Sequence, residues 1–208
     1  SVRINGRPIE RLDARTRARL RAVLPQHSDS AFSFTALEVA ALGRYAFGGS
    51  GSEDRAIARH ALALADAAHL SERELPTLSG GERARVHLAA AFAQLWEREC
   101  DEARYLLLDE PTAALDLAHQ HHVLGTVRAF AAQRALGVLA IVHDLNLAAL
   151  YADRLYVLRD GALLAQGRPQ EVLTPELIGT GFAVAARVLA HPLKPALLVA
   201  TAHRSAAL

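Results

Sequence analysis

Methionine is absent from this sequence of 208 residues, cysteine and lysine occur once each, and aromatic residues make up only 5%. A disulfide scaffold is excluded because Cys100 has no partner within the chain, and a lone thiol is typical of a reducing compartment. No run approaches the ~18 consecutive apolar residues that a membrane-spanning helix needs, and the N-terminus has no signal-peptide pattern. We therefore expect a globular protein of the cytosol that does not itself span a membrane.

Neither positive nor negative charge is in excess. Lysine and arginine number 23 against 22 acidic residues, which gives a formal net charge of +1. The chain therefore offers no electrostatic footprint for nucleic acid. Alanine accounts for 43 residues, a composition that favours helix. The length fits a single domain, or one domain with a small subdomain.

The order of the helix and strand signals predicts an α/β fold. Residues 2–9 are expected to form a hairpin around Asn5-Gly6, a dipeptide that readily adopts the positive φ values of tight turns. Residues 34–96 have a helical pattern and are interpreted as a helical subdomain, with long helices at 53–70 and 82–97. The rest alternates as in a parallel sheet covered by helices, with strands at 22–25, 104–108, 138–142 and 154–159 and helices at 117–134 and 145–151. The tail from residue 181 is weakly patterned.

An apolar strand ends in two adjacent carboxylates. Leu106-Leu107-Leu108 precedes Asp109-Glu110, at the sheet edge where open α/β folds bind ligands. This pattern is typical of phosphate chemistry, with Asp109 beside Mg²⁺ and Glu110 polarising the water that attacks a nucleotide. A solvated turn is the common alternative for a strand that ends in Asp-Glu, so the surrounding motifs have to decide.

Four further segments supply that context. Leu78-Ser79-Gly80-Gly81-Glu82 opens a helix, whose N-terminal N–H groups and dipole can hold a phosphate. His143 follows the strand at 138–142, and parallel neighbouring strands would place its imidazole beside the two carboxylates. Gln26 follows the strand at 22–25, where an amide can reach both the metal and the water. Asp116, in Ala114-Leu115-Asp116, could meet a second copy of the protein across a shared nucleotide.

Together these motifs resemble those of the ATP-binding subunits of ABC transporters. Gln26 matches the Q-loop, residues 78–82 the signature motif, residues 106–110 the Walker B strand with its catalytic glutamate, Leu115-Asp116 the D-loop and His143 the switch histidine. The five motifs occur in family order, and the resemblance covers nearly the whole chain. It implies one ABC-type ATPase domain over 1–208: a P-loop NTPase (RecA-like) parallel sheet core at 1–26 and 98–208, with an inserted helical subdomain at 27–97.

The resemblance also implies ligands and partners. Two copies would sandwich two ATP molecules, with Mg²⁺ held by Asp109 and Gln26. Two membrane permease subunits would dock near Phe32 and Phe34, at the cytoplasmic face of the bacterial inner membrane; core packing is the alternative role for these aromatic rings. A periplasmic binding protein would be only an indirect partner, and nucleic acid is not expected. The residues that would bind ATP are Ser79, Gly80, Gly81, Glu82 and Asp116.

The segments around the motifs narrow the resemblance. Residues 21–27, 104–109, 116–121 and 143–149 are similar to ATPases of importers for iron-siderophores, cobalamin and haemin, with haemin the best match. The implied function is ATP-driven uptake of haemin or a related iron chelate. His119, His121 and His122 raise the idea of a metal or haem site, but histidines on a solvated helix are the ordinary interpretation.

One motif of the family is missing. The phosphate loop Gly-x-x-x-x-Gly-Lys-Ser/Thr needs a lysine, and Lys194 has no glycine run before it. Because position 1 is not methionine and the first strands resemble those after the phosphate-loop helix in relatives, several tens of residues are expected upstream of Ser1. The alternatives are a non-catalytic ABC-like regulatory or dimerisation module, and a soluble ABC ATPase of DNA repair or translation, which the neutral charge disfavours.

The 208-residue chain is therefore predicted not to hydrolyse ATP. The residues that assist the transition state are present, while the lysine and the backbone cradle of the phosphate loop are not. A steady-state phosphate-release assay measures this directly. Turnover on the order of 1 s⁻¹ would contradict the prediction.

Overall fold

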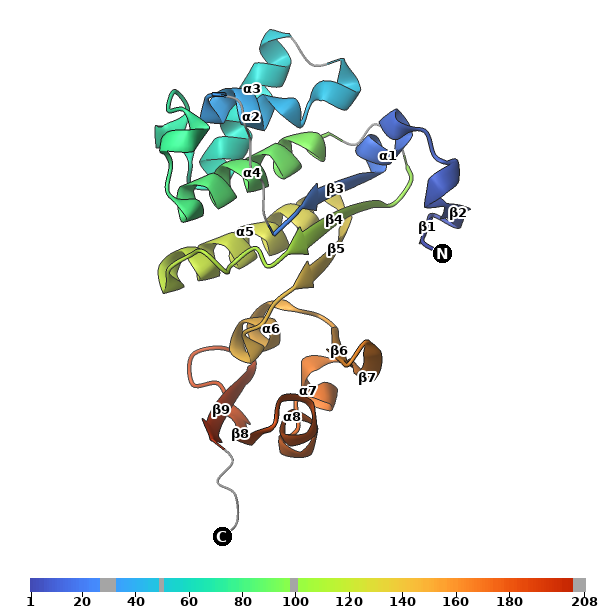
Figure 1. Ribbon diagram of the computed structural model, residues 1–208, viewed down its shortest axis with the longest axis vertical. Coiled ribbons are helices and arrows are strands. Elements are labelled where there is room, and N and C mark those ends of the chain that lie inside the picture. Colours follow the sequence, from blue (N-terminus) through green and yellow to red (C-terminus); the bar gives the residue numbers. More distant parts are fainter. Residues whose placement is uncertain (27–32, 49–50, 98–100, 204–208) are drawn as a thin grey trace. The chain divides into compact units, whose positions relative to one another are not determined.

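The computed structural model describes residues 1–26, 33–48, 51–97 and 101–203. Contacts within the chain gather into two compact units, Ser1–Ile141 and Val142–Leu208 (Figure 1). Phe32 and Cys100, about which the sequence makes predictions, lie outside the described residues. None of the helices in the described ranges has the length and apolarity to cross a bilayer. Each unit has a hydrophobic core of its own.

A short hairpin opens the first unit. Asn5 and Gly6 form its turn with φ values of 50° and 77°, as a tight hairpin turn requires, so the prediction for residues 2–9 is confirmed. Asp13 caps the next helix by accepting a hydrogen bond from the Thr16 N–H at 2.9 Å. The elements of this segment are β1 (Arg3–Ile4), β2 (Arg7–Pro8), η1 (Ile9–Arg11) and α1 (Ala14–Leu20).

Three parallel strands form the sheet of the first unit. Their order is β3 (Arg21–Leu24), β4 (Arg104–Asp109), β5 (Leu136–Ile141), and α5 (Leu117–Arg134) supplies the crossover from β4 to β5. Leu24 lies opposite Leu108, and Asp109 lies opposite Ile141. The carboxyl ends of the three strands therefore meet at one edge, and the predicted parallel sheet is confirmed for these strands. The strand predicted over 154–159 does not join them, because residues 155–159 pair antiparallel with residues 162–167 in a separate sheet.

A group of helices lies between β3 and β4 in the sequence. In Figure 1, α4 lies between the sheet and the other helices of this group, and it contacts β3. Phe92 of α4 is fully buried, and its ring centroid lies 4.5 Å from that of Phe130 in α5. The elements are α2 (Ala36–Leu42), η2 (Tyr45–Phe47), α3 (Ser52–Leu64), η3 (Ala68–Leu70), η4 (Leu75–Thr77) and α4 (Gly80–Gln94).

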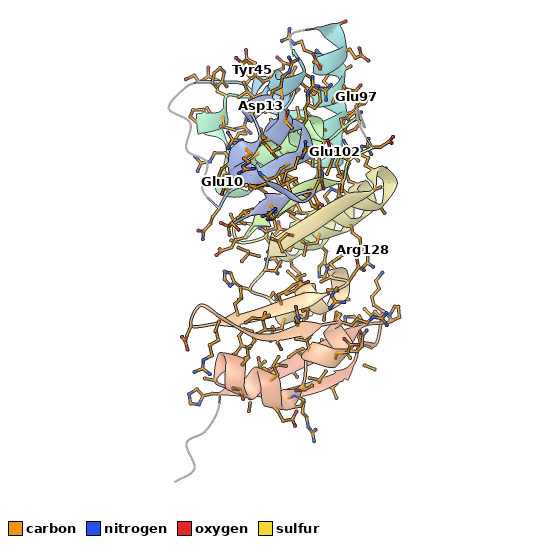
Figure 2. All side chains as sticks on the ribbon, turned by 90° about the vertical axis from the view of Figure 1, so that its right-hand side faces the viewer. Glu10, Asp13, Tyr45, Glu97, Glu102 and Arg128 are labelled. Carbon is orange, nitrogen blue, oxygen red and sulfur yellow. The ribbon has the colours of Figure 1, made fainter. Side chains whose placement is uncertain are left out.

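The helical group is fastened by one backbone contact and one buried cation. A β-carbon at Gly43, which ends α2, would lie 2.2 Å from the carbonyl oxygen of Ala90 in α4, so only glycine fits there. The neighbouring Arg44 is buried and donates to the Asp54 carboxylate at 2.8 Å and to the Ala93 carbonyl at 3.2 Å. The guanidinium thus joins α2 to both α3 and α4. In contrast, the ring of nearby Tyr45 is exposed (Figure 2).

The long helix predicted over 53–70 is wrong in its last third, because α3 ends at Leu64. The Ala67 N–H donates to the Leu62 carbonyl at 2.8 Å, and the Asp66 N–H donates to the Ala63 carbonyl at 3.1 Å. This is the Schellman arrangement, with Asp66 in the left-handed region at a φ of 53°. Glycine usually marks such an end, and aspartate in its place hid the signal.

The second unit contains two antiparallel hairpins. The β8–β9 hairpin was not predicted, because alanines inside both strands weaken the strand signal. Asn146 of α6 holds β9 by accepting from the Val199 N–H at 2.7 Å and donating to its carbonyl at 3.2 Å. The elements are α6 (Leu145–Tyr151), β6 (Leu155–Arg159), β7 (Ala162–Gly167), α7 (Pro169–Val172), α8 (Pro175–Phe182), β8 (Val184–Ala190) and β9 (Leu197–His203).

Candidate functional site

Two residues with oxygen-bearing side chains lie at or just after the carboxyl ends of neighbouring strands of the sheet. Half-buried Asp109 ends β4, and exposed Gln26 lies two residues after the end of β3. The β3–β4 register places the ends of these strands side by side. Carboxylate and amide oxygens are ligands that Mg²⁺ accepts in proteins, so the donor set at this edge fits that ion.

Glu110 directly after β4 has a constrained backbone. Its φ of 50° lies in the left-handed region, which few residues other than glycine adopt. Its N–H donates to the carbonyl of Ile141 in β5 at 3.2 Å, and its carbonyl accepts from the Ala113 N–H at 3.2 Å. The turn is therefore held from both sides. Backbone strain of this kind is concentrated at functional sites.

Ser79 and Glu82 form a capping box at the start of α4. The Ser79 hydroxyl accepts from the Glu82 N–H at 3.3 Å, and the Glu82 carboxylate accepts from the Ser79 N–H at 2.7 Å. Hydrogen bonds to its carboxylate from the Ser79 backbone N–H and then from the Ser79 side chain lower the pKa of Glu82, and the cations Arg73 and Arg85 lower it further. The first-turn N–H groups of Gly80 and Gly81 have no intrahelical acceptor, as at any helix start, and remain available to an anion.

The start of α4 shares a hollow of about 440 Å³ with the turn that follows β4. A β-carbon at Gly81 would lie 3.0 Å from the carbonyl oxygen of Ala114 and 3.3 Å from the side chain of Leu115. One at Gly80 would lie 3.8 Å from Ala114. The structure thus brings the signature motif and the D-loop of the same chain into contact, an arrangement that the sequence did not predict.

Arg85 lines this hollow and was not singled out from the sequence. It is 7% exposed, and its Nε has no hydrogen-bond partner among the described residues. A buried cation beside an open helix N-terminus suits a phosphate. The available signal was spacing: Gly81 and Arg85 are four residues apart and share a face of α4.

Asp116 of the D-loop caps α5. Its carboxylate accepts from the His119 N–H at 2.9 Å, and both of its oxygens lie 2.8 Å from Nδ1 of the His119 ring. The backbone hydrogen bond from His119, then the side-chain one, lower the pKa of Asp116. Asp116 is therefore an anion at neutral pH, in the same hollow as the signature motif.

His143 lies in the second unit, two residues before the start of α6. It is exposed, and the next residue, Asp144, caps α6 by accepting from the N–H groups of Asn146 and Leu147 at 2.7 and 3.0 Å. Its expected place beside Asp109 and Glu110 involves both units, so that expectation stays a prediction.

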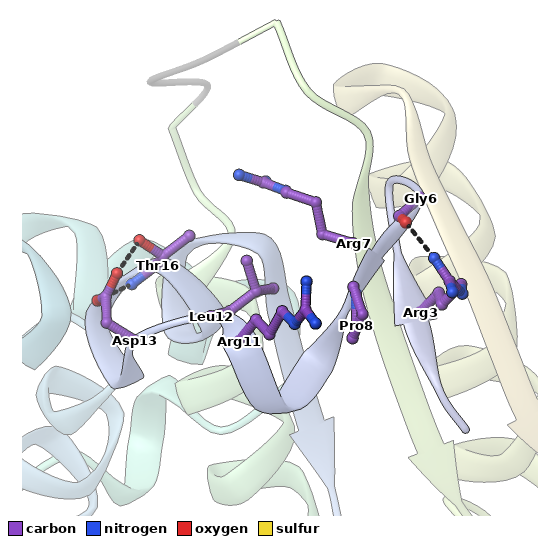
Figure 3. Close-up of a pocket in the computed structure, with 8 residues that line it drawn as sticks. All are labelled: Arg3, Gly6, Arg7, Pro8, Arg11, Leu12, Asp13 and Thr16. Atoms are coloured by element: carbon purple, nitrogen blue, oxygen red, sulfur yellow. Dashed lines mark hydrogen bonds between the residues drawn. The ribbon is translucent and has the colours of Figure 1, made fainter.

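A second hollow, of about 550 Å³, lies beside the N-terminal hairpin (Figure 3). Arg3, Arg7 and Arg11 line it. Arg3 donates to the carbonyl of Gly6 at 2.9 Å, and Arg7 pairs with Glu102. None of the motif residues lines this hollow, so it is not the candidate site.

Comparison with known proteins gives a consistent result. Residues 1–113 match the sequence pattern of the family described as ABC transporter. The chain is 54% identical over 194 residues to the hemin import ATP-binding protein HmuV of Gloeobacter violaceus, covering 92% of this chain and 70% of that protein. It is 55% identical over 184 residues to the protein of the same name from Burkholderia thailandensis, covering 85% and 67%.

Solved structures are also similar. An inward-facing putative metal-chelate type ABC transporter has a TM-score of 0.73 and 28% identity, covering 88% of this chain and 73% of that one. The ATP-binding cassette MJ0796, in a dimeric post-hydrolysis state bound to ADP and phosphate, has a TM-score of 0.69 and 25% identity, covering 80% and 72%.

The two signature glycines should respond differently to alanine. Gly80→Ala places its β-carbon at ordinary contact distance and is expected to raise the free energy of unfolding by about 0.4–1 kcal/mol, as glycine replacement in a helix does. Gly81→Ala should gain less or lose stability, because the Ala114 carbonyl has to move. Urea denaturation of both variants measures the difference. Equal stabilisation would mean that the contact between Gly81 and the D-loop is not tight.

Proposed function

This chain belongs to the ABC transporter family, and we propose that it powers the uptake of haemin or a related iron chelate across the bacterial inner membrane. Membership of the family makes it a nucleotide-binding ATPase subunit. The observation that carries the substrate proposal is the 54% identity with a hemin import ATP-binding protein over 92% of the chain. The substrate itself need not touch this subunit.

The hollow between the start of α4 and the turn after β4 supports a role in binding a nucleotide phosphate. Gly80 and Gly81 would donate their backbone N–H groups, and the helix dipole of α4 adds positive potential. Arg85 would add a full charge through a guanidinium that is already desolvated. Ser79 and Glu82 fix the direction of the helix start through their capping box, so the N–H groups are aimed before the phosphate arrives.

The carboxyl edge of the sheet supports a role in hydrolysis. Asp109 and Gln26 would hold Mg²⁺, which when bound neutralises charge on the phosphates. Glu110 would orient and polarise the attacking water. The hydrogen-bonded turn that contains Glu110 limits the movement of its backbone and so of its carboxylate. His143 would contact the γ-phosphate.

The active form is proposed to be a homodimer that sandwiches two ATP molecules. The signature motif of one copy would face the nucleotide held by the other, and Asp116 would lie at the dimer contact. The dimeric state described for two structures of a similar ATP-binding cassette supports this arrangement.

Two permease subunits are the proposed membrane partners, at the cytoplasmic face of the inner membrane. A similar structure, at 28% identity, is described as an inward-facing conformation of a putative metal-chelate type ABC transporter. The proposed docking region around Phe32 and Phe34 belongs to the helical subdomain, assigned to residues 27–97. Phe34 is partly buried against the hydrophobic core of the first unit, so its contribution to docking would come from the exposed part of its ring.

A non-catalytic ABC-like module is the second candidate function. The observation that favours it is the absence of Gly-x-x-x-x-Gly-Lys-Ser/Thr from the 208 residues. The two candidates differ in whether the wild-type protein hydrolyses ATP, and only a protein that does can lose turnover through Glu110→Gln.

Glu110→Gln is expected to keep ATP binding and to reduce hydrolysis by ~100-fold or more, because the amide keeps the shape and loses the carboxylate that orients water. His143→Ala should reduce hydrolysis as well. The assay needs a polypeptide that includes the family's phosphate loop, with nucleotide binding and phosphate release measured in parallel. Glu72→Gln, at an exposed glutamate of the helical group, is the control and should keep full turnover.

The same variants test which molecule the transporter takes up. Proteoliposomes that contain this ATPase with its permease subunits and internal ATP should take up haemin or an iron chelate, and the Glu110→Gln vesicles should not. Full turnover in Glu110→Gln would refute the catalytic assignment. Uptake of cobalamin, without uptake of haemin or an iron chelate, would refute the substrate.

Gly81→Asp should block ATP-driven dimerisation in a Glu110→Gln background while leaving nucleotide affinity nearly intact. The new carboxylate would face the partner's γ-phosphate in a confined, poorly screened site. Size-exclusion chromatography with ATP measures the dimer. Gly81→Ala controls for the steric contact with Ala114, and Gly51→Asp adds the same charge at an open helix start. Dimers of Gly81→Asp that form as readily as those of Gly51→Asp would show that the signature motif does not face a phosphate.

A further inference from the structure

Two elements of the first unit meet at His119. Its Nδ1 lies 2.8 Å from both carboxylate oxygens of Asp116, and its Nε2 lies 3.5 Å from a carboxylate oxygen of Asp66. One turn away, Nε2 of His122 lies 3.3 Å from the carbonyl oxygen of Leu64. The imidazole of His119 therefore contacts the D-loop aspartate with one nitrogen and the end of α3 with the other.

The number of protons on the ring decides what this arrangement can hold. A neutral imidazole has one N–H donor, and an imidazolium has two. Ionised carboxylates only accept hydrogen bonds. His119 can therefore donate to Asp66 and Asp116 together only when it is protonated.

Charged groups on three elements border the ring. From the turn after α3 the ring faces Asp66, and from its own helix it faces Asp116. From α4, the hollow that it lines adds the carboxylate of Glu82 and the guanidinium of Arg85. The neighbouring His122 contacts a carbonyl and, among the residues that the structure describes, no carboxylate. Three carboxylates against one guanidinium leave the ring in a negative environment.

The backbone at Asp66 points to the same contact. Glycine most often occupies the left-handed position at a helix end, and aspartate tolerates it. Here an aspartate stands at that position, with a φ of 53°. A glycine would close the turn equally well, but only the aspartate presents a carboxylate to α5.

We propose that His119 positions the D-loop: as an imidazolium it bridges Asp66 and Asp116 and so fastens the start of α5 to the helical group. His119 is a positioning residue, since it acts through Asp116. The inference rests on the proposed function in one respect, namely that Asp116 acts in the ATP sandwich. Protonation then couples the placement of the D-loop to that of the helices that carry the signature motif.

Hydrogen exchange of the D-loop amides, at residues 114–118 of the 208-residue chain, tests the bridge without ATP. The measurements are made at about pH 6 and about pH 8.5, on either side of the range in which histidines usually lose their proton. At the lower pH, His119→Gln and Asp66→Asn should each speed exchange about two- to fivefold, the range for a partly exposed ion pair. The double variant should exchange no faster than the faster single variant. At the higher pH all ratios to the wild type should fall towards one.

His122→Gln is the matched control, because His122 lies on the same helix, contacts the same turn and has no carboxylate partner in the described part of the chain. Its ratio should be the same at both pH values. Ratios for His119→Gln and Asp66→Asn that do not change with pH, or effects that add in the double variant, would overturn the bridge. If His119→Gln does not fold, Asp66→Asn and Asp66→Gly carry the same test, since both residues tolerate the left-handed turn.

The outcome is independent of the proposed function. If hydrogen exchange confirms the bridge but Glu110→Gln keeps full turnover, the His119 bridge stands and the catalytic assignment is rejected. If Glu110→Gln loses turnover but exchange does not depend on pH, the catalytic assignment stands and the bridge is rejected.

Discussion

The contact between Gly81 and Ala114 is the constraint on which the candidate site depends. With no side chain at Gly81, the start of α4 reaches the turn after β4 at backbone distance. The helical group and the sheet therefore share one hollow, into which both the N–H groups of the signature motif and the carboxylate of Asp116 open. A β-carbon at this position would lie 3.0 Å from the Ala114 carbonyl oxygen, so a larger residue would force the turn after β4 to shift.

Patterns with a local cause were predictable from the sequence. Alternating strands and helices gave the parallel sheet, Asn5-Gly6 gave the hairpin, and the order of the motifs gave the family. Features that depend on an unusual backbone conformation at a single residue were not predictable. The left-handed turns at Asp66 and Glu110 lack the glycine that usually indicates such a turn in a sequence. The strands of the β8–β9 hairpin contain alanines, which weaken the strand signal. The roles of Gln26, His143 and the other site residues remain predictions.

The near absence of lysine has a structural counterpart. Buried Arg104 donates to the Leu95 carbonyl at 3.1 Å, and Arg134 donates to the Trp96 carbonyl at 2.9 Å. Arg134 also lies over the rings of Trp96 and Phe130, 4.4 and 4.3 Å from their centroids. These positions use the planar, multiply donating guanidinium, which satisfies carbonyls at a helix end while stacking on a ring. A lysine ammonium could not do both.

The glycine at the end of α2 has a mechanical consequence. Helices usually pack through a layer of interlocking side chains, and domain motions often occur as small sliding of such packed helices. At Gly43 no such layer separates α2 from α4, and the buried guanidinium of Arg44 ties the same pair together. The two helices are therefore joined at a point with no compressible side chains between them, and α2 is expected to move together with α4 as one body.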